Sequence, residues 1–472
     1  MGDLPRGTGH PPVLLLCVVG LSPDLLAHAP RLGALADRGA LATLRPPLPA
    51  VTCTSQASMV TGAGPRAHGI VGNGWYFRDL AEVWFWRQSN HLVLGPEKLW
   101  VRARRVRPGA CVAKLFWWFN MYAPVDIAVT VRPHYPADGR KIPGIYTAPA
   151  SLERRLEAEL GPFPLFRFWG PGADLVSSRW IARAAHRVLR WAEPDLLAVY
   201  LPHLDYDLQR HGPLDPRIPA EVAAVDALAG ELVDAVLERG GLALVVSEYG
   251  IDAVRGASYP NRALREAGLL AVRASRYVGT LLDPGASRAF CVCDHQVGHV
   301  YVRDPADLER TRSVLERLEG IGAVLVGEQR ARHGLDHPRA GEIVLLAERD
   351  RWLAYPYWRA DEPAPDFAPT VDIHRKPGYD PLELFLAPGW RTRARLAWRI
   401  AQRKLGVRAL FDVIPSDDRL VRGSHGLLPR SPERGPLLIS SDARLVPRAA
   451  LPMEAVRDVV LEALSRRRAS GG

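Results

Sequence analysis

Residues 48–73 contain the stretch Leu48-Pro-Ala-Val-Thr52-Cys-Thr-Ser-Gln-Ala-Ser-Met-Val-Thr-Gly62, which continues as Pro65-Arg-Ala-His68-Gly69-Ile-Val-Gly-Asn73. A short helix is expected to begin near Thr52 and to end at Gly62, because glycine often follows the last residue of a helix. A hydroxyl at a helix N-terminus meets free backbone N–H groups and the positive end of the helix dipole, which suit a phosphoryl oxyanion. Thr52 is also an ordinary helix-capping residue. By itself the stretch therefore leaves two roles open, a cap or a reacting hydroxyl.

Alternating strands and helices surround this stretch. The run Val13-Leu-Leu-Leu-Cys-Val-Val19 is continuously apolar and ends at Gly20, which is typical of a buried parallel strand. Two more apolar strands are expected at 196–201 and 242–247, each after a helix, at 178–191 and 219–239. This order predicts an α/β fold with a doubly wound sheet flanked by helices.

The rest of the chain divides by composition and periodicity. A basic helix is expected over 391–404, and a βαββ pattern after residue 289 predicts a small inserted α+β subdomain. The predicted organisation is a core over 10–285 with an aromatic-rich insertion at about 75–170, the α+β subdomain over 286–365, a return to the core over 366–450, and a C-terminal helix and tail over 451–472.

Composition narrows the function classes. The net charge of +10 comes mainly from Arg and favours anionic partners, but no nucleic-acid-binding module is present in the sequence. Five cysteines in a long chain do not indicate a disulfide framework. The apolar run at 13–19 is too short to span a bilayer and lacks the features of a signal peptide. We expect a cytoplasmic protein with no membrane span that acts on a small phosphorylated or anionic substrate; the sequence carries no signal for the oligomeric state.

The extended pattern around Thr52 resembles a known family. Pro-x-x-Thr, a short helix ending in Val-Thr-Gly, then Pro-x-x-His-Gly-Ile and a nearby Asn resemble the type I phosphodiesterase/nucleotide pyrophosphatase branch of the alkaline phosphatase superfamily, which includes phosphonoacetate hydrolase. The resemblance implies an alkaline-phosphatase-like fold. It also implies that Thr52 is the nucleophile, with Ser55 and Asn73 on the oxyanion side.

Three later segments fall where this family has metal ligands. His203-Leu-Asp205-Tyr-Asp207-Leu-Gln209-Arg-His211 follows a strand, and either the pair Asp205/Gln209 or the pair Asp207/His211 fills the Asp-x-x-x-His positions. Ser247-Glu248-Tyr249-Gly250 stands in place of Ser-Asp-His-Gly. Gly423-Ser-His425-Gly426 matches the last ligand motif. The resemblance thus implies Asp205, Gln209, Glu248 and His425 as metal residues, with His211, Tyr249 and His374 as further candidates.

Three family ligand positions carry residues that bind metal poorly. Val19 stands where the family has an aspartate, and Gln209 and Tyr249 replace histidines. Two zinc ions each need about four ligands. With these three positions substituted, half of the family's ligands for the zinc pair are missing. One oxygen-preferring ion such as Mg, Mn or Ca is the other cofactor that these residues suggest. Asp294 and His374 are candidates to compensate for Val19, and His295, next to Asp294, is a further candidate site residue.

The sequence therefore predicts a metal-dependent hydrolase of a phosphodiester, nucleotide pyrophosphate or related phosphonate, with one or two divalent ions and Thr52 as nucleophile. The substituted ligands leave two alternatives. One is a catalytically degenerate homologue that binds an anionic ligand. The other is a specialised biosynthetic enzyme on the same fold.

Overall fold

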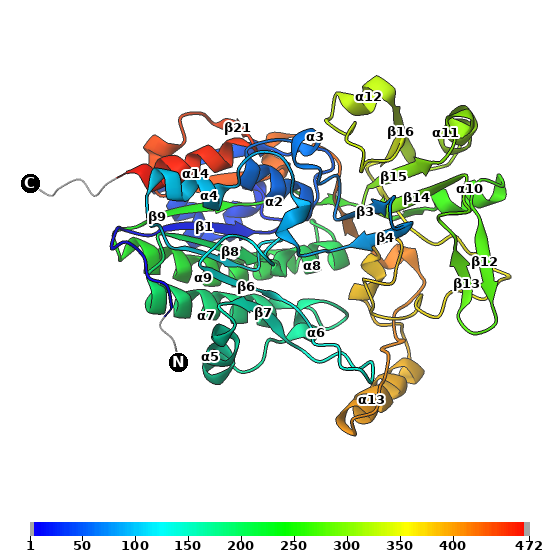
Figure 1. Cartoon of the computed structure of the whole chain (residues 1–472), viewed down its shortest axis with the longest axis horizontal. Coiled ribbons are helices and arrows are strands. Elements are labelled where there is room, and N and C mark those ends of the chain that lie inside the picture. The colour runs from blue at the N-terminus through cyan, green and yellow to red at the C-terminus, as the bar shows by residue number, and fades with distance from the viewer. Residues whose placement is uncertain (1–3, 467–472) are drawn as a thin grey trace, which may run out of the picture.

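A central nine-stranded sheet organises the computed structural model, which describes residues 4–466 (Figure 1). The expected tail beyond Arg466 lies outside the described residues. The strand order is β21 (Ala450–Pro452), β2 (Ala40–Arg45), β20 (Leu437–Ser440), β9 (Leu242–Val246), β1 (Val13–Val18), β8 (Leu196–Leu201), β5 (Val112–Leu115), β6 (Ile127–Val131) and β7 (Ile145–Ala148).

The middle of this sheet is parallel. Strand β1 pairs in parallel with β8 and β9, and β5 pairs in parallel with β8 and β6, whereas β20 and β7 run antiparallel to their neighbours. All six residues of β1 are buried, as a strand covered on both faces requires. Neighbouring strands of the sheet are not consecutive in the chain, except β5, β6 and β7. The parallel middle of the sheet confirms the predicted α/β sheet flanked by helices.

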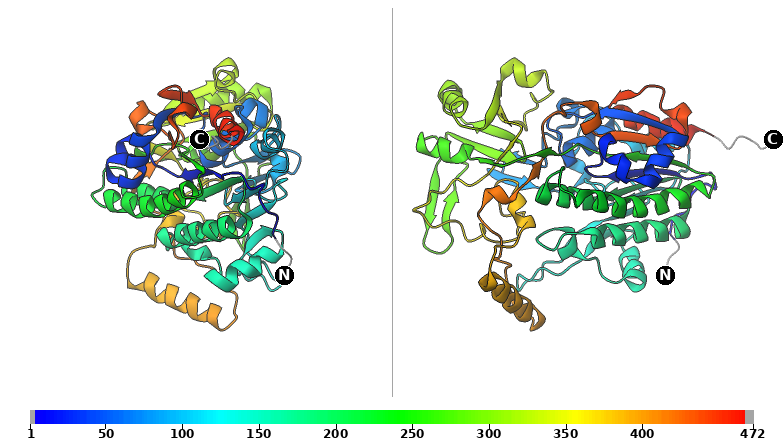
Figure 2. Two further views of the ribbon diagram at one scale, coloured as in Figure 1. Left: turned by 90° about the vertical axis from the view of Figure 1, so that its left-hand side faces the viewer. Right: turned by 180° about the vertical axis from the view of Figure 1, so that it is seen from behind.

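Helices cover both faces of the sheet (Figures 1 and 2). One face carries α7 (Leu175–Ala192) and α9 (Ile218–Leu237), which pack on each other and on β8, β1 and β9, and α9 also packs on α1 (Pro30–Arg38) and α8 (His203–His211). The other face carries α2 (Thr52–Thr61), α4 (Leu99–Val106) and α14 (Ala455–Ser465). The remaining helices of the core are α3 (Pro65–His68), α5 (Ser151–Leu160) and α6 (Leu165–Phe168).

The range 75–170, expected as an insertion, also supplies β5, β6 and β7 to the central sheet. Its first part forms a hairpin of β3 (Gly74–Phe77) and β4 (Glu82–Phe85). The three sheet strands are only four or five residues long and lie among aromatic residues. Their short apolar runs therefore carry too little periodicity to be separated from the surrounding loop.

A second, smaller sheet lies at one end of the molecule (Figure 1). Its order is β14 (Ala289–Asp294), β15 (Val297–Val302), β17 (Ile343–Ala347) and β16 (Ile321–Val326), and all neighbours are antiparallel. Helices α10 (Pro260–Glu266), α11 (Leu308–Glu316) and α12 (Gly327–Ala331) accompany it. Short two-stranded pairs complete the chain: β10 (Asp252–Ala253) with β19 (Gly423–Ser424), β11 (Gly256–Ser258) with β18 (Arg351–Leu353), and β12 (Val272–Ser275) with β13 (Gly279–Leu282).

Helix α13 (Trp390–Lys404) stands apart from both sheets in all three views (Figures 1 and 2). Among residues 4–466, no helix combines the length and the hydropathy that a bilayer crossing requires.

Candidate active site

The candidate site lies where the three central parallel strands end. The register pairs Val18 with Leu201 and Cys17 with Val246, so β1, β8 and β9 finish side by side at their carboxyl ends. The segments that leave this edge carry Val19 after β1, the start of α8 after β8, and Glu248 and Tyr249 after β9. Ligands of open α/β sheets bind at this edge.

Thr52 is the first residue of α2 and is buried at this edge. Its Oγ1 lies 3.1 Å from the hydroxyl oxygen of Tyr249, and that hydroxyl donates to Oδ1 of Asp205 over 3.2 Å. A tyrosine hydroxyl has one proton. Because Tyr249 donates it to Asp205, the bond from Thr52 to Tyr249 must be donated by Thr52. The oxygen of Thr52 therefore keeps its lone pairs free.

The other oxygen of Asp205 is also hydrogen-bonded. Gln209, one turn later on α8, donates from Nε2 to Oδ2 of Asp205 over 2.7 Å, and the hydroxyl of Tyr379 donates to Oε1 of Gln209 over 2.9 Å. Burial raises the pKa of Asp205 to about 7, and the bonds from Gln209 and Tyr249 oppose that rise. Both oxygens of this carboxyl thus meet neutral donors.

Glu248 precedes Tyr249 in the chain and is fully buried. Its Oε1 accepts a 2.6 Å bond from Nε2 of Gln56, whereas Oε2 has no hydrogen-bond partner among the described residues. Burial raises the pKa of Glu248 to about 8, and the bond from Gln56 opposes that rise. The hydroxyl of Ser55 donates to the backbone oxygen of Glu248 over 3.1 Å, so its one proton is already used.

His425 carries a lone pair directed at the same site. Its Nδ1 lies 2.9 Å from the carbonyl oxygen of Ala50, which can only accept, so Nδ1 holds the proton. Burial lowers the pKa of His425 to about 3, which keeps the ring neutral. Its Nε2 has no hydrogen-bond partner among residues 4–466 and lies 3.8 Å from Oδ1 of Asp205. This nitrogen is therefore available as a ligand or acceptor.

Four rings stack behind this centre. The ring of His425 lies between Tyr249, at a centroid distance of 3.6 Å, and His295, at 3.7 Å, and His295 stacks in turn on Tyr379 at 3.8 Å. Burial lowers the pKa of His295 well below its usual value. His295 has a φ of 58° in the turn between β14 and β15, so the small sheet contributes to the site.

Asn73 fixes the start of α2 rather than pointing freely into the site. Its Oδ1 accepts from the backbone N–H of Cys53 over 3.0 Å. Its Nδ2 donates to Oδ1 of Asp294 over 3.0 Å, and its backbone N–H donates to Oδ2 over 2.7 Å. Burial raises the pKa of Asp294 to about 7. Asp294 and Asn73 together hold the turn that carries Thr52.

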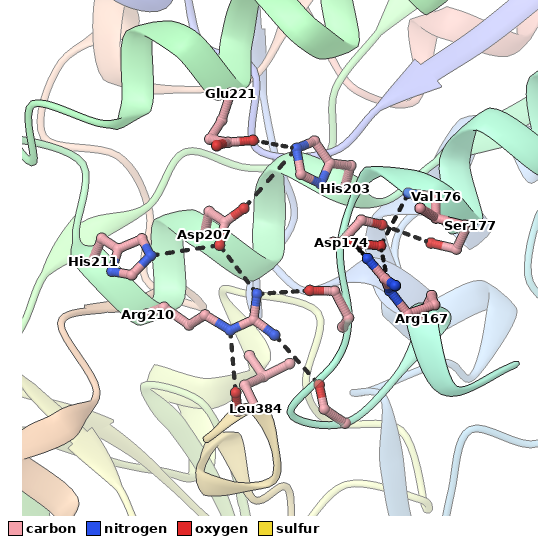
Figure 3. A network of polar contacts seen from close by, with 12 residues as sticks. Arg167, Asp174, Val176, Ser177, His203, Asp207, Arg210, His211, Glu221 and Leu384 are labelled. Atoms are coloured by element: carbon pink, nitrogen blue, oxygen red, sulfur yellow. Dashed lines mark hydrogen bonds and ion pairs between the residues drawn. The ribbon is translucent and has the colours of Figure 1, made fainter. Parts of the chain in front are cut away.

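The structure separates the two possible pairs on α8. Asp205 and Gln209 face Thr52, whereas Asp207 lies in a different cluster, with Oδ1 3.6 Å from Nε2 of His211 and 3.1 Å from Arg210 (Figure 3). His374 contacts the backbone of Phe85 and, among the described residues, no member of the network around Asp205. The sequence interpretation did not include Gln56 and Tyr379, because a lone amide or phenol carries no motif. Gln56 does stand one helical turn after Thr52, which is a usable signal.

The donor set does not fit two zinc ions. Among residues 4–466, the only His, Cys, Asp and Glu side chains that bring three ligand atoms within 4.8 Å of one another are His203, Asp207 and Glu221. Asp205, Glu248 and His425 do not form such a group, and Val19 offers no ligand atom. The unpartnered Nε2 of His425 beside Asp205 fits one divalent ion at most.

The chain is similar to known proteins in sequence and in fold. The model of the family "Type I phosphodiesterase / nucleotide pyrophosphatase" matches residues 13–380. Phosphonoacetate hydrolase from Sinorhizobium meliloti, solved in complex with phosphonoformate, is 16% identical with a TM-score of 0.61, covering 98% of this chain and 100% of that one. Murine ectonucleotide pyrophosphatase/phosphodiesterase 5 is 14% identical with a TM-score of 0.56, covering 96% and 95%. At such identities the two structures show a shared fold.

Proposed function

Because the chain belongs to the type I phosphodiesterase/nucleotide pyrophosphatase family, we propose that it hydrolyses a small phosphate ester or phosphonate with Thr52 as the nucleophile. The observation that carries this proposal is the chain of hydrogen bonds from Thr52 through Tyr249 to Asp205. The two solved relatives support the substrate class, since phosphonoacetate hydrolase was also crystallised with phosphonoacetate and the murine protein with AMP.

The residues allow a two-step reaction. Oγ1 of Thr52 attacks phosphorus while its proton moves to the Tyr249 oxygen and the Tyr249 proton moves to Asp205, so the hydroxyl of Tyr249 is regenerated. The bond between phosphorus and the leaving group breaks, and the leaving group takes up a proton from water, which leaves hydroxide. In the second step hydroxide attacks phosphorus, the bond from phosphorus to Oγ1 of Thr52 breaks, and the proton held by Asp205 returns through Tyr249 to Oγ1. The positive end of the α2 dipole lies beside the developing negative charge.

The family is one of metal-dependent hydrolases, and this donor set admits one ion rather than the zinc pair. We propose that Asp205 and His425 hold it, with the amide oxygen of Gln209 as a third donor, a set compatible with Mg or Mn. When bound, such an ion would polarise a phosphoryl oxygen as a Lewis acid. Glu248, an expected ligand, has one carboxylate oxygen bonded to Gln56.

The test is hydrolysis of a nitrophenyl phosphodiester and of phosphonoacetate by the purified chain, with and without added Mg or Mn. Thr52→Ala should abolish turnover and Thr52→Ser should retain part of it, because serine keeps the hydroxyl. Thr61→Ser on the same helix is the matched control, since its hydroxyl bonds to the Ala57 carbonyl and faces away from the site. Equal turnover in Thr52→Ala and the wild type would refute the proposal.

A second candidate function is binding without turnover. It is favoured by the three substituted ligand positions, Val19, Gln209 and Tyr249. This candidate predicts calorimetric binding of phosphonoacetate with no product under any divalent ion. We also retain the prediction of a cytoplasmic location, which the five free cysteines support.

A further inference from the structure

Helix α13 presents an apolar stripe to solvent. Trp390 is 75% exposed, Trp398 60% and Leu405, just past the helix end, 78%. At 3.6 residues per turn, these three positions fall on one side of the helix, together with Ala394 and Ala401. Exposed tryptophans gathered on one stripe are unusual on a protein surface and mark an interaction site.

Cationic residues flank the stripe on both sides. Arg391 lies on one edge, and Arg393 and Lys404 on the other, all exposed. From Trp390 to Arg408 the sequence contains no Asp or Glu, while its cations are Arg391, Arg393, Arg395, Arg399, Arg403, Lys404 and Arg408. An apolar stripe bordered by arginine, with tryptophan at the boundary, is the pattern of a helix that lies in the interface of a membrane.

The face of α13 away from the stripe is tied to the protein. Arg399 donates to both carboxylate oxygens of Asp412, at 2.9 and 3.1 Å, and Arg395 donates to the backbone oxygen of Asp412. Because the body occupies that side only, the tryptophan stripe stays open, and the helix protrudes far enough to lie flat on a surface (Figure 2).

A basic cavity lies beside the helix. It has a volume of about 540 Å³ and is lined by Asp366, Arg375, Arg399, Arg408 and Leu410. Arg375 pairs with Asp366 and Arg399 with Asp412, whereas Arg408 forms no ion pair with a described residue. Three guanidinium groups around one cavity favour a phosphate group.

From these observations we propose that α13 docks the protein onto membranes rich in anionic phospholipid, with Trp390, Trp398 and Leu405 in the headgroup region and the arginines on the lipid phosphates. The anionic surface complements the basic segment, and the two tryptophans match the interfacial zone of a bilayer better than the rim of a polar protein interface. The proposal is independent of the reaction at Thr52.

The test is co-sedimentation of the full chain with vesicles of phosphatidylcholine, with and without phosphatidylglycerol. Wild-type protein should bind the anionic vesicles, and added salt should weaken binding. Trp390→Ala/Trp398→Ala and Arg391→Glu/Arg393→Glu should each lower the partition coefficient by at least about tenfold. The matched control is Arg276→Glu/Tyr277→Ala, because Tyr277 is 76% exposed beside an arginine, on the turn between β12 and β13 and outside α13.

Circular dichroism and thermal melting check that each variant is folded. The proposal is overturned if wild-type protein does not bind anionic vesicles, or if the control lowers binding as much as the α13 variants. It is also overturned if the chain binds an acidic polypeptide such as polyglutamate through α13 but not vesicles. A lipid-free dimer that dissociates in the tryptophan variant, with no vesicle binding, would assign the stripe to a contact between copies instead.

Discussion

Restoring the three missing ligands should convert this site into a two-zinc centre. The perturbation is the triple variant Val19→Asp, Gln209→His, Tyr249→His. All three side chains are buried, with Val19 and Tyr249 just after β1 and β9 and Gln209 on α8, so the new groups would lie at the edge of the sheet that also carries Asp205 and Glu248. The ligand set would then hold three carboxylates and three imidazoles, close to what two zinc ions require.

The expected magnitude follows from burial and from the lost hydrogen bonds. Without metal, an unpaired buried carboxylate at position 19 costs about 3–5 kcal/mol or is protonated instead. Loss of the Tyr249 hydroxyl also removes the bonds to Thr52 and Asp205. Zinc at a thousand times its dissociation constant stabilises the folded state by about 4 kcal/mol per site. Zinc should therefore reverse the destabilisation, since two sites contribute roughly 8 kcal/mol.

The assay is metal analysis after dialysis, with thermal melting in the presence and absence of zinc. Wild-type protein should retain at most one equivalent and the triple variant two. A control with Val19→Leu, Gln209→Leu and Tyr249→Phe keeps similar volumes without the ligand atoms and should gain no zinc. Two tightly held equivalents in the wild type, or no gain in the triple variant, would refute the reasoning about the donor set.

Three further predictions concern single residues. Tyr249→Phe should lower kcat by roughly a hundredfold or more with little change in KM, because the ring still stacks on His425 while the proton route is lost; unchanged kcat would exclude the route. Asn73→Ala should destabilise the protein by about 1–3 kcal/mol in denaturant titration, since it leaves Oδ1 of Asp294 and the N–H of Cys53 unpaired; an effect under 0.5 kcal/mol would contradict the bonding described, since the lost bonds alone cost about that much or more. The free energy of unfolding of the metal-free protein should fall as pH rises from about 6.5 to 8. Burial raises the pKa of Glu248 to about 8, so the folded state keeps a proton that the unfolded state releases. That loss is about 2 kcal/mol for one group, and in melting curves Glu248→Gln should flatten it; an equal slope in the variant would show that Glu248 does not carry the effect.

The central sheet was predictable because its inner strands are long and apolar. Val13–Val19 and Leu196–Leu201 are continuous apolar runs. Gly20 follows the first run, and the segment with His203 and Asp205 follows the second. The strands β5 to β7 were not predicted. The four residues of β5 include Lys114, which is buried and donates to the backbone oxygens of Trp118 and Phe119. A buried lysine inside a four-residue strand hides the apolar pattern on which the prediction depends.

The candidate site was predictable only where its residues belong to a local motif. The position of Thr52 follows from the residues around it, but Tyr379 reaches Gln209 across 170 positions, and no local pattern encodes that contact. His295 was considered only as a substitute ligand. It lies instead in a turn and stacks on His425. Its place depends on how the small sheet packs against the large one, which single-sequence patterns do not specify.

The three substituted ligands form a consistent electrostatic set. A buried carboxylate needs a cation or hydrogen-bond donors. Val19 removes one carboxylate from the site, while Gln209 and Tyr249 each donate to Asp205. Uncorrelated loss of ligands would leave Asp205 unpaired beside the neutral His425. The substitutions instead remove one negative charge and provide hydrogen-bond donors for the carboxylate of Asp205, which remains. The site therefore needs less positive charge from metal ions to be stable. Asp205→Asn should therefore destabilise the metal-free wild-type protein only by the loss of one of these two hydrogen bonds, about 1–3 kcal/mol. It should destabilise the zinc-loaded triple variant more strongly, because the carboxylate of Asp205 there holds zinc in place of these hydrogen bonds.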